Sequence, residues 1–108
     1  MIMPTLSEQD FRLKSDHALE SARRALIPLA DEEDFEIEMQ NGVLQLTFEQ
    51  PVGSRFVVSP NAPMRQIWVA AMAKGYKLSW SPELDAFALD GEPLAVLLRR
   101  LIRTLLDG

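Results

Sequence analysis

The fold is decided by residues 31–49, DEEDFEIEMQNGVLQLTFE, which combine a hairpin signal with the densest charge in the chain. Asn-Gly between alternating apolar residues is a strong hairpin signal, because both central positions of a type I′ turn need the positive φ that Asn and Gly tolerate. We therefore expect a two-residue turn at Asn41 and Gly42. Counting outward from this turn pairs the apolar residues of the two strands: Phe35 with Phe48, Ile37 with Leu46 and Met39 with Leu44.

The two faces of this hairpin differ in chemistry. The apolar pairs share one face, and the other face carries Glu36, Glu38, Gln45 and Thr47. A slip of one residue would turn the apolar set to water, so the register is well specified. Glu36 and Glu38 are therefore expected to point outward, directly after four acidic residues at positions 31–34. No basic residue adjoins this run, which makes it the candidate site.

Composition limits the classes of function. The 108 residues are 47% hydrophobic, which suits one domain over residues 1–108. The chain has no cysteine, so it can form neither a disulfide nor a thiolate metal site. No apolar run approaches the ~20 residues of a membrane span, and we expect a soluble protein. A net charge of -5 disfavours nucleic acid and anionic membranes and favours cations or a basic protein surface.

The hairpin is predicted to follow a first helix and to precede four further strands and a second helix. Thr5 and Glu8 resemble a capping box, and apolar residues at helical spacing predict a helix over residues 6–27 that Pro28 ends. Turn-rich stretches at residues 50–53 and 59–63 and at 81–83 separate the later strands, expected at residues 55–58, 64–72, 76–80 and 86–89.

The last segment is predicted to be a second helix that Pro93 opens at its first position. Its leucines form one apolar stripe, and Arg99, Arg100 and Arg103 take the solvent side. Strands bracketed by two helices imply an α+β fold: a two-layer α-β sandwich whose antiparallel sheet of about six strands is covered on one face by both helices.

Several short motifs, in this order, resemble the frataxin family. Residues 63–68, PMRQIW, are similar to that family's Pro-x-x-Gln-Ile/Val-Trp block, and Gly75-Tyr76 and Trp80 follow at a suitable distance. The sequence Asn41-Gly42-Val43-Leu44 ahead of Thr47-Phe48 is similar to the family's Gly-Val-Leu-Thr pattern. The resemblance covers nearly the whole chain. It implies a small acidic α-β sandwich of iron handling and iron–sulfur cluster assembly in a bacterial cytoplasm.

The resemblance implies a metal site on the acidic stretch. Frataxins bind iron and a cysteine desulfurase through an acidic ridge at the end of the first helix and the edge of the first strand. The strand half of this ridge corresponds here to Glu32, Asp34, Glu36 and Glu38, and Asp31 and Glu33 lie close by, so all six are candidate metal ligands. The helical half of the ridge does not carry over, because Arg23 and Arg24 stand near the expected helix end. We expect weak, unselective binding of Fe2+ or Fe3+ and no organic cofactor. Without the resemblance, a solvated charged face is the more frequent meaning of such a run.

The resemblance also implies a docking patch on the uncovered sheet face, made of Arg65, Gln66, Trp68 and Lys77. Alternation along the strand directs Gln66 and Trp68 outward and Ile67 inward, although a core position for Trp68 is the alternative. His17 has no neighbouring His or Cys, so we leave it out of the site.

No constellation of nucleophile, base and oxyanion donors is visible in the sequence. We therefore expect an iron-binding adaptor that docks on a complex of a cysteine desulfurase and a cluster scaffold protein. The alternatives are a ferroxidase or iron-storage protein and an acidic interaction module without a metal role. We expect a monomer, with iron-dependent oligomerisation as the alternative. We expect neither nucleic acid nor a membrane among its partners.

Overall fold

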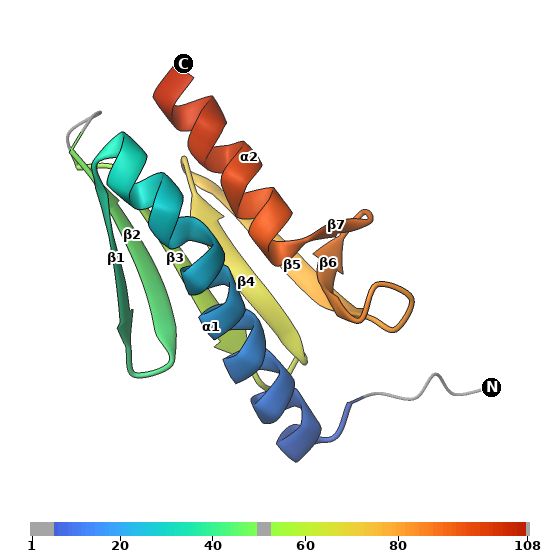
Figure 1. Ribbon diagram of the computed structural model, residues 1–108. Coiled ribbons are helices and arrows are strands. Elements are labelled where there is room, and N and C mark those ends of the chain that lie inside the picture. The colour runs from blue at the N-terminus through green and yellow to red at the C-terminus, as the bar shows by residue number, and fades with distance from the viewer. Residues whose placement is uncertain (1–5, 50–52, 108) are drawn as a thin grey trace.

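The computed structural model describes residues 6–49 and 53–107, which form one antiparallel sheet and two helices (Figure 1). The elements are α1 (Glu8–Glu33), β1 (Phe35–Gln40), β2 (Val43–Phe48), β3 (Arg55–Asn61), β4 (Gln66–Ala71), β5 (Lys74–Ser81), β6 (Ala86–Leu89), β7 (Glu92–Pro93) and α2 (Leu94–Asp107). The strands lie in the sheet in chain order, and both helices pack on the same face. The predicted sandwich is confirmed, with the two-residue β7 added to the six expected strands.

The first hairpin has the predicted register. Phe35 pairs with Phe48, Ile37 with Leu46 and Met39 with Leu44. The turn residues Asn41 and Gly42 have φ of 54° and 77°, as a type I′ turn requires. Phe35 and Phe48 also touch across the two strands, with ring centroids 4.8 Å apart. The apolar face of the hairpin therefore lies on the helix side of the sheet, and the acidic face is turned away from it.

The start and the end of α1 both differ from the sequence prediction. The N-cap is Ser7, whose Oγ accepts a hydrogen bond of 3.0 Å from the Asp10 amide. The predicted cap Thr5 lies outside the described residues. Pro28 does not end the helix, which continues to Glu33 and stops at Asp34 in the left-handed region at φ 56°. The Asp34 amide donates to the carbonyl oxygen of Ala30 and closes the last turn.

Tertiary packing explains why a helix passes through Pro28. A proline inside a helix removes one hydrogen bond and costs about 3 kcal/mol. Here Pro28 lies on the exposed side of α1, while Leu26, Leu29 and Ala30 on either side of it are buried against the sheet and α2. The apolar area that these residues bury favours keeping the last turn helical. The prediction of a stop at residue 27 was therefore wrong.

Other boundaries move as well. The strand β5 runs from Lys74 to Ser81, where residues 76–80 were expected, and β4 ends at Ala71 instead of residue 72. The strand β3 continues through Pro60 to Asn61, so the turn predicted at residues 59–63 is shorter. The following strand begins at Gln66 rather than at residue 64, because Arg65 adopts a left-handed φ of 53° in the turn. Pro93 belongs to β7, and α2 begins one residue later. Most of the turn predicted at residues 50–53 lies outside the described ranges.

The core lies between the sheet and the helices. Its largest fully buried side chains include Phe56 and Phe87 from the sheet and Leu19, Leu26 and Leu97 from the helices. The leucine stripe of α2 is buried and its three arginines are exposed, as the periodicity predicts. The helices differ in length, with 26 residues in α1 and 14 in α2, so α1 spans the sheet and α2 covers only part of it beside α1 (Figure 1).

The turn between β4 and β5 is conformationally unusual. Ala71 pairs with Lys74, so Met72 and Ala73 form a two-residue turn with φ of 51° and 64°. Neither residue is Gly or Asn, and the left-handed region costs an ordinary residue about 1–2 kcal/mol. Met72 is half-buried and packs against the core. Packing therefore holds this turn in a strained conformation.

Candidate functional site

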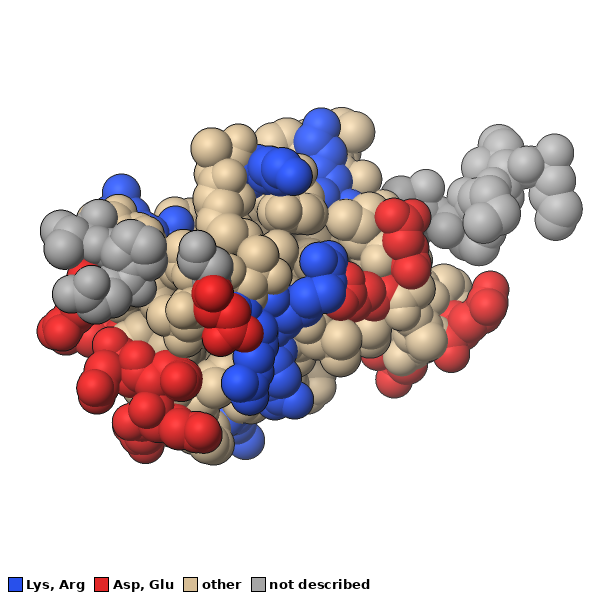
Figure 2. Space-filling view, turned by 90° about the horizontal axis from the view of Figure 1, so that it is seen from above, with Lys and Arg blue, Asp and Glu red and all other residues tan. Residues whose placement is uncertain are grey.

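We use the name acidic edge for the carboxylates of Asp31, Glu32, Glu33, Asp34, Glu36 and Glu38. Their positions follow from the sharp turn between α1 and β1, in which Asp34 is the only intervening residue. The first three belong to the last turn of α1, and the last two project from β1, the outermost strand. Figure 2 shows acidic side chains gathered at this end of the molecule, beside a separate ridge of basic ones. Residues 31–33, which were expected to lie between the first helix and the first strand, belong to the helix, so the helix end does contribute carboxylates.

The acidic edge places negative charge at the negative end of the α1 dipole. The C-terminal end of a helix carries a partial negative charge, and the last turn of α1 contains acidic residues and no basic one. Glu36 and Glu38 are exposed and point to the same side of β1, about 6.7 Å apart along the strand. Among residues 6–49 and 53–107, no carboxylate of the acidic edge forms an ion pair. In the described ranges, the acidic edge is therefore an open negative surface without direct ion pairs.

The acidic edge is not arranged as a closed metal cage. In the described part of the chain, no three His, Cys, Asp or Glu side chains lie close enough to hold one ion together. Carboxylate oxygens are nonetheless the ligands that hard cations prefer. The donor set therefore fits solvated cations that two neighbouring carboxylates share with water.

Arg23 and Arg24 bind a carboxylate of their own helix. Arg23 holds Glu20 with two hydrogen bonds, 2.9 Å from Nε and 2.7 Å from Nη2, and Arg24 Nε donates to Glu20 Oε1 at 3.2 Å. The hydrogen bond from Arg23 is the main cause that lowers the pKa of Glu20 to about 2. The charge of Glu20 is thus more than balanced by the two arginines, and the acidic edge begins only at Asp31.

The uncovered face of the sheet carries an ordered aromatic group. Trp68 is half-buried on this face, while its neighbours Ile67 and Val69 are buried on the other. The indole Nε1 donates to Gln66 Oε1 at 3.0 Å, and Gln66 Nε2 donates to Ser79 Oγ at 3.2 Å. The predicted alternation of β4 is confirmed. We call Gln66, Trp68, Lys77 and Ser79 the tryptophan patch; Ser79 is a member that the sequence analysis did not include, although alternation along β5 places it beside Lys77.

Lys77 joins this patch across the β4–β5 pairing. It lies directly opposite Trp68 in the register, and its Nζ is 5.0 Å from the centroid of the indole ring. A cation at this distance is attracted to the face of the ring. A shallow hollow of about 180 Å3 adjoins the ring and is lined by Val57, Ser59 and Tyr76 among others. Trp68 is therefore an ordered aromatic side chain beside an open hollow.

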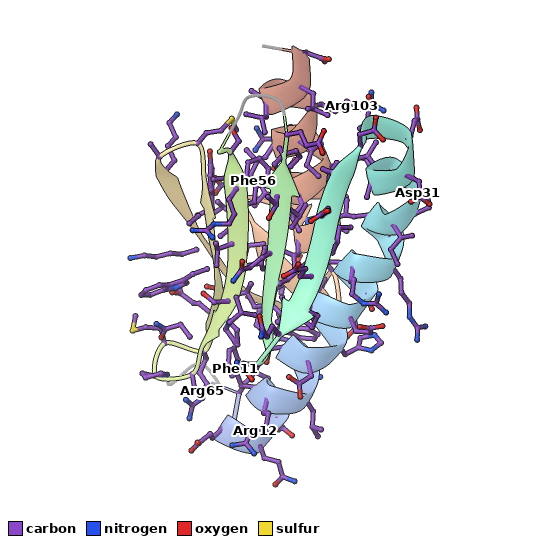
Figure 3. The ribbon with its side chains drawn as sticks, turned by 90° about the vertical axis from the view of Figure 1, so that its left-hand side faces the viewer. Phe11, Arg12, Asp31, Phe56, Arg65 and Arg103 are labelled. Carbon is purple, nitrogen blue, oxygen red and sulfur yellow. The ribbon has the colours of Figure 1, made fainter. Side chains whose placement is uncertain are left out.

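Arg65 is directed to another part of the molecule. Its Nε donates to the carbonyl oxygen of Leu6 at 3.0 Å, and its Nη1 donates to that of Ala62. Figure 3 places Arg65 at the end of the molecule where α1 begins, near Phe11 and Arg12, and Asp31 at the opposite end. The contacts of Arg65 tie the β3–β4 turn to the segment before α1, so the structure does not bring it together with Trp68.

Glu36 and Glu38 of the acidic edge share the uncovered face with the tryptophan patch. Glu38 lies opposite Gln45 in β2, Gln45 opposite Val57 in β3, and Val57 opposite Ala70 in β4, two residues from Trp68. Three strand spacings separate β1 from β4, which is about 14 Å. One partner surface of ordinary size can therefore contact both.

Two remaining sequence predictions have structural outcomes. His17 is exposed, and its Nε2 lies 3.4 Å from Ser21 Oγ one turn along α1, far in sequence from the acidic edge. In the described ranges, neither helix is long and apolar enough to span a membrane.

The sandwich, with its acidic edge and its aromatic group on the open face, defines a class of small α-β proteins, and comparison with known proteins gives the family. The chain belongs to the frataxin-like domain family, whose model matches residues 4–107. It is 33% identical over 100 residues to the iron-sulfur cluster assembly protein CyaY of Ralstonia nicotianae, covering 93% of this chain and 88% of that protein. The corresponding protein of Cupriavidus metallidurans is 38% identical over 76 residues, covering 68% of this chain and 67% of the relative.

Solved structures agree with the fold. Yeast frataxin superposes with a TM-score of 0.68 at 19% identity, covering 99% of this chain and 92% of that one. Frataxin from Psychromonas ingrahamii gives a TM-score of 0.67 at 15% identity, covering 92% and 90%. These two likenesses establish the architecture of the sandwich.

Proposed function

We propose that this chain acts in iron–sulfur cluster assembly, as an iron-binding adaptor that docks on a cysteine desulfurase complex. Its family membership and the cluster-assembly names of its relatives support the general role. The observation that carries the docking part is the ordered Trp68 side chain, which stands on the face that the helices leave open, three strands away from Glu36 and Glu38.

Iron is the cargo in this proposal. Two carboxylates on one side of β1, with more at the end of α1, attract hard cations without enclosing them. An ion held mostly by water and one or two carboxylates exchanges readily, because few protein ligands must be broken. The acidic edge thus concentrates iron at an interface and gives it up there.

Docking combines charge with an aromatic anchor that the partner covers. The acidic edge steers the chain toward a basic partner surface, an effect that falls as salt rises. Trp68 then supplies contact area at small cost in conformational entropy, which is why Trp is enriched among binding hot spots. Its ring is already fixed by Gln66 and Lys77. Docking therefore loses little side-chain freedom.

A binding titration with a purified cysteine desulfurase tests the docking. Trp68→Ala should weaken binding at least about tenfold, a loss of ~1.4 kcal/mol. Val96→Ala removes an exposed apolar side chain from the helix face and serves as the matched control. Equal affinity of the wild-type chain and Trp68→Ala, or no binding by the wild-type chain, would refute the docking proposal.

A second experiment separates the adaptor from its alternatives. Fe(II) is titrated anaerobically, and oxygen is then admitted. The adaptor binds iron without accelerating its oxidation, whereas a ferroxidase accelerates oxidation catalytically. A chain that does neither is an interaction module without a metal role.

A further inference from the structure

The helix layer leaves part of the sheet uncovered beside α1. At 1.5 Å per residue, α1 with 26 residues is about 39 Å long and α2 with 14 residues is about 21 Å long. Both helices reach the same end of the sheet, and α2 stops well short of the other end (Figure 1). A hollow of about 430 Å3 lies next to the first half of α1. It occupies the place in the helix layer that a longer α2 would fill. We call this hollow the helix slot.

The floor of the helix slot is aromatic and its walls are short side chains. Trp80 and Phe87 from β5 and β6 form the floor, with ring centroids 5.2 Å apart in an edge-to-face contact. Trp80 is only half-buried, although it points to the helix side of the sheet. The walls include four alanines, which explains why the space is open: Ala18, Ala22, Ala86 and Ala95.

The rim of the helix slot is apolar as well. Leu13 lines it and is 62% exposed, and Leu84 and Val96, next to the lining residues Asp85 and Ala95, are 45% and 51% exposed. The described residues include two other large hydrophobic side chains of comparable exposure, Ile27 and Met64. Apolar side chains that surround an apolar hollow are typical of a protein–protein contact.

Charge at the helix slot favours an acidic occupant. Lys14 Nζ lies 4.4 Å from the centroid of the Trp80 ring, and no ion pair in the described ranges involves it. The slot also ends at the first residues of α2, the positive end of that helix, whose first turn contains no acidic residue. The exposed Asp85 is the one carboxylate among the lining residues, on the lip opposite α1.

We propose that the helix slot receives an acidic amphipathic helix of a partner protein, lying in line with α2. Its apolar stripe would cover Trp80 and Phe87, and its carboxylates would meet Lys14. Its C-terminal end would face the start of α2, so that the two helix dipoles align head to tail. This is the helix-in-groove mode of recognition, with anchors at positions i, i+3, i+4 and i+7. The slot lies beside the first half of α1, whereas the acidic edge is at the other end of α1 and the tryptophan patch is on the opposite face of the sheet, so the partner leaves both free.

The test titrates the 15N-labelled full chain with synthetic helical peptides of roughly 12 residues, because α1 is about 18 Å longer than α2. One peptide carries leucines at i, i+3, i+4 and i+7 with glutamates on the flanks, a second has the same composition with scattered leucines, and a third carries lysines for glutamates. The first should bind with a dissociation constant below about 1 mM and shift the Trp80 indole and the amides of the four wall alanines. The other two should bind at least about tenfold more weakly.

Matched variants of the full chain locate the binding. Ala18→Leu fills the slot and Leu13→Asp charges its rim, and each should weaken the first peptide at least about tenfold. Ala25→Leu makes the same change two turns along α1, outside the slot, and should leave binding unchanged. Lys14→Glu should reduce the preference for the acidic peptide, whereas Arg12→Glu, with the same charge change on the exposed side of α1, should not.

The proposal is overturned if none of the peptides binds, if scattered leucines bind as well, or if Ala18→Leu and Leu13→Asp, both folded by thermal melt, bind like wild type. Shifts of the slot signals on concentrating the chain alone would show that a second copy fills the slot, and this too overturns it. None of these measurements uses iron or a desulfurase, so their failure leaves the cluster-assembly proposal unaffected.

Discussion

Lys77 Nζ lies 5.0 Å from the centroid of the Trp68 ring, and together they occupy the sheet face that no helix covers. Because Trp68 is only half-buried, Trp68→Ala should cost less than about 2 kcal/mol of unfolding free energy. Phe56→Ala, which empties a fully buried site, should cost ~3–5 kcal/mol. Urea unfolding of both variants measures the contrast. A loss at Trp68 as large as that at Phe56 would mean that the ring is structural and not held for a partner.

Cations should stabilise the chain through β1. Any ion that binds only the folded state raises the melting temperature, and the neighbouring carboxylates of Glu36 and Glu38 repel each other without it. The double variant Glu36→Gln/Glu38→Gln should therefore melt higher than wild type without metal and gain less from millimolar Fe(II) under anaerobic conditions. Glu83→Gln, in the β5–β6 turn, is the control. An identical response of wild type and the double variant would place the iron elsewhere.

The carboxylates at the end of α1 should cost stability, because they lie at the negative end of the helix dipole. Asp31→Asn and Glu32→Gln should each raise the free energy of unfolding by about 0.3–1 kcal/mol at low salt. The opposite effect is expected for Glu8→Gln, since Glu8 lies in the first turn at the positive end. Chemical denaturation at low and high salt measures both. A loss of stability in Asp31→Asn and Glu32→Gln would show that these side chains have favourable contacts in the folded state.

The ion pair of Glu20 with Arg23 should contribute a pH-dependent stability. In the folded state the pKa of Glu20 is lowered from 4.5 to about 2. The stability that the ion pair contributes is therefore fully present above about pH 4.5 and is lost as the pH falls toward 2. The stability gap between wild type and Glu20→Gln should thus close over that range. Unfolding curves at neutral pH, pH 4 and pH 2.5 follow it. A gap that is constant with pH would mean that Glu20 acts through packing instead of charge.

The strained turn between β4 and β5 offers a stabilising substitution. Ala73 is exposed at φ 64°, where glycine has no Cβ penalty. Ala73→Gly should raise the free energy of unfolding by about 0.5–1 kcal/mol, the strain relieved less the entropy that glycine loses. Ala62→Gly, at an exposed turn residue without positive φ, should instead lower it. A loss of stability in Ala73→Gly would contradict the assigned strain.

Local pattern was sufficient for the hairpin and its carboxylates. Asn41-Gly42 and the strict alternation around it determine turn, register and face together, so Glu36 and Glu38 point outward as predicted. The orientation of Trp68 followed from the same alternation in β4. In these segments one face is apolar throughout, and only one register buries it.

The sequence-based predictions failed where contacts between residues distant in sequence determine the structure. Pro28 has a strong local preference to end a helix, but the burial of Leu29 and Ala30 extends α1 and moves Asp31 and Glu32 onto the helix. Arg65 gave no local sign that its guanidinium would reach the carbonyl oxygen of Leu6, which is 59 residues away in sequence. The helix slot depends on the length of α2 relative to α1, a comparison that periodicity within either helix does not reveal.

The order of the strands has a consequence for how the chain is made. Each strand pairs with the next one in sequence, so the sheet can grow by short loop closures as the chain leaves the ribosome. The helix α2 follows all seven strands in the described sequence, and its Leu97, Leu98, Leu101 and Ile102 complete the core only after the strands have been made. Until then part of the apolar face of the sheet is exposed to other chains and to proteases. The fourteen residues of α2 thus determine how long the newly made sheet stays open to aggregation and cleavage.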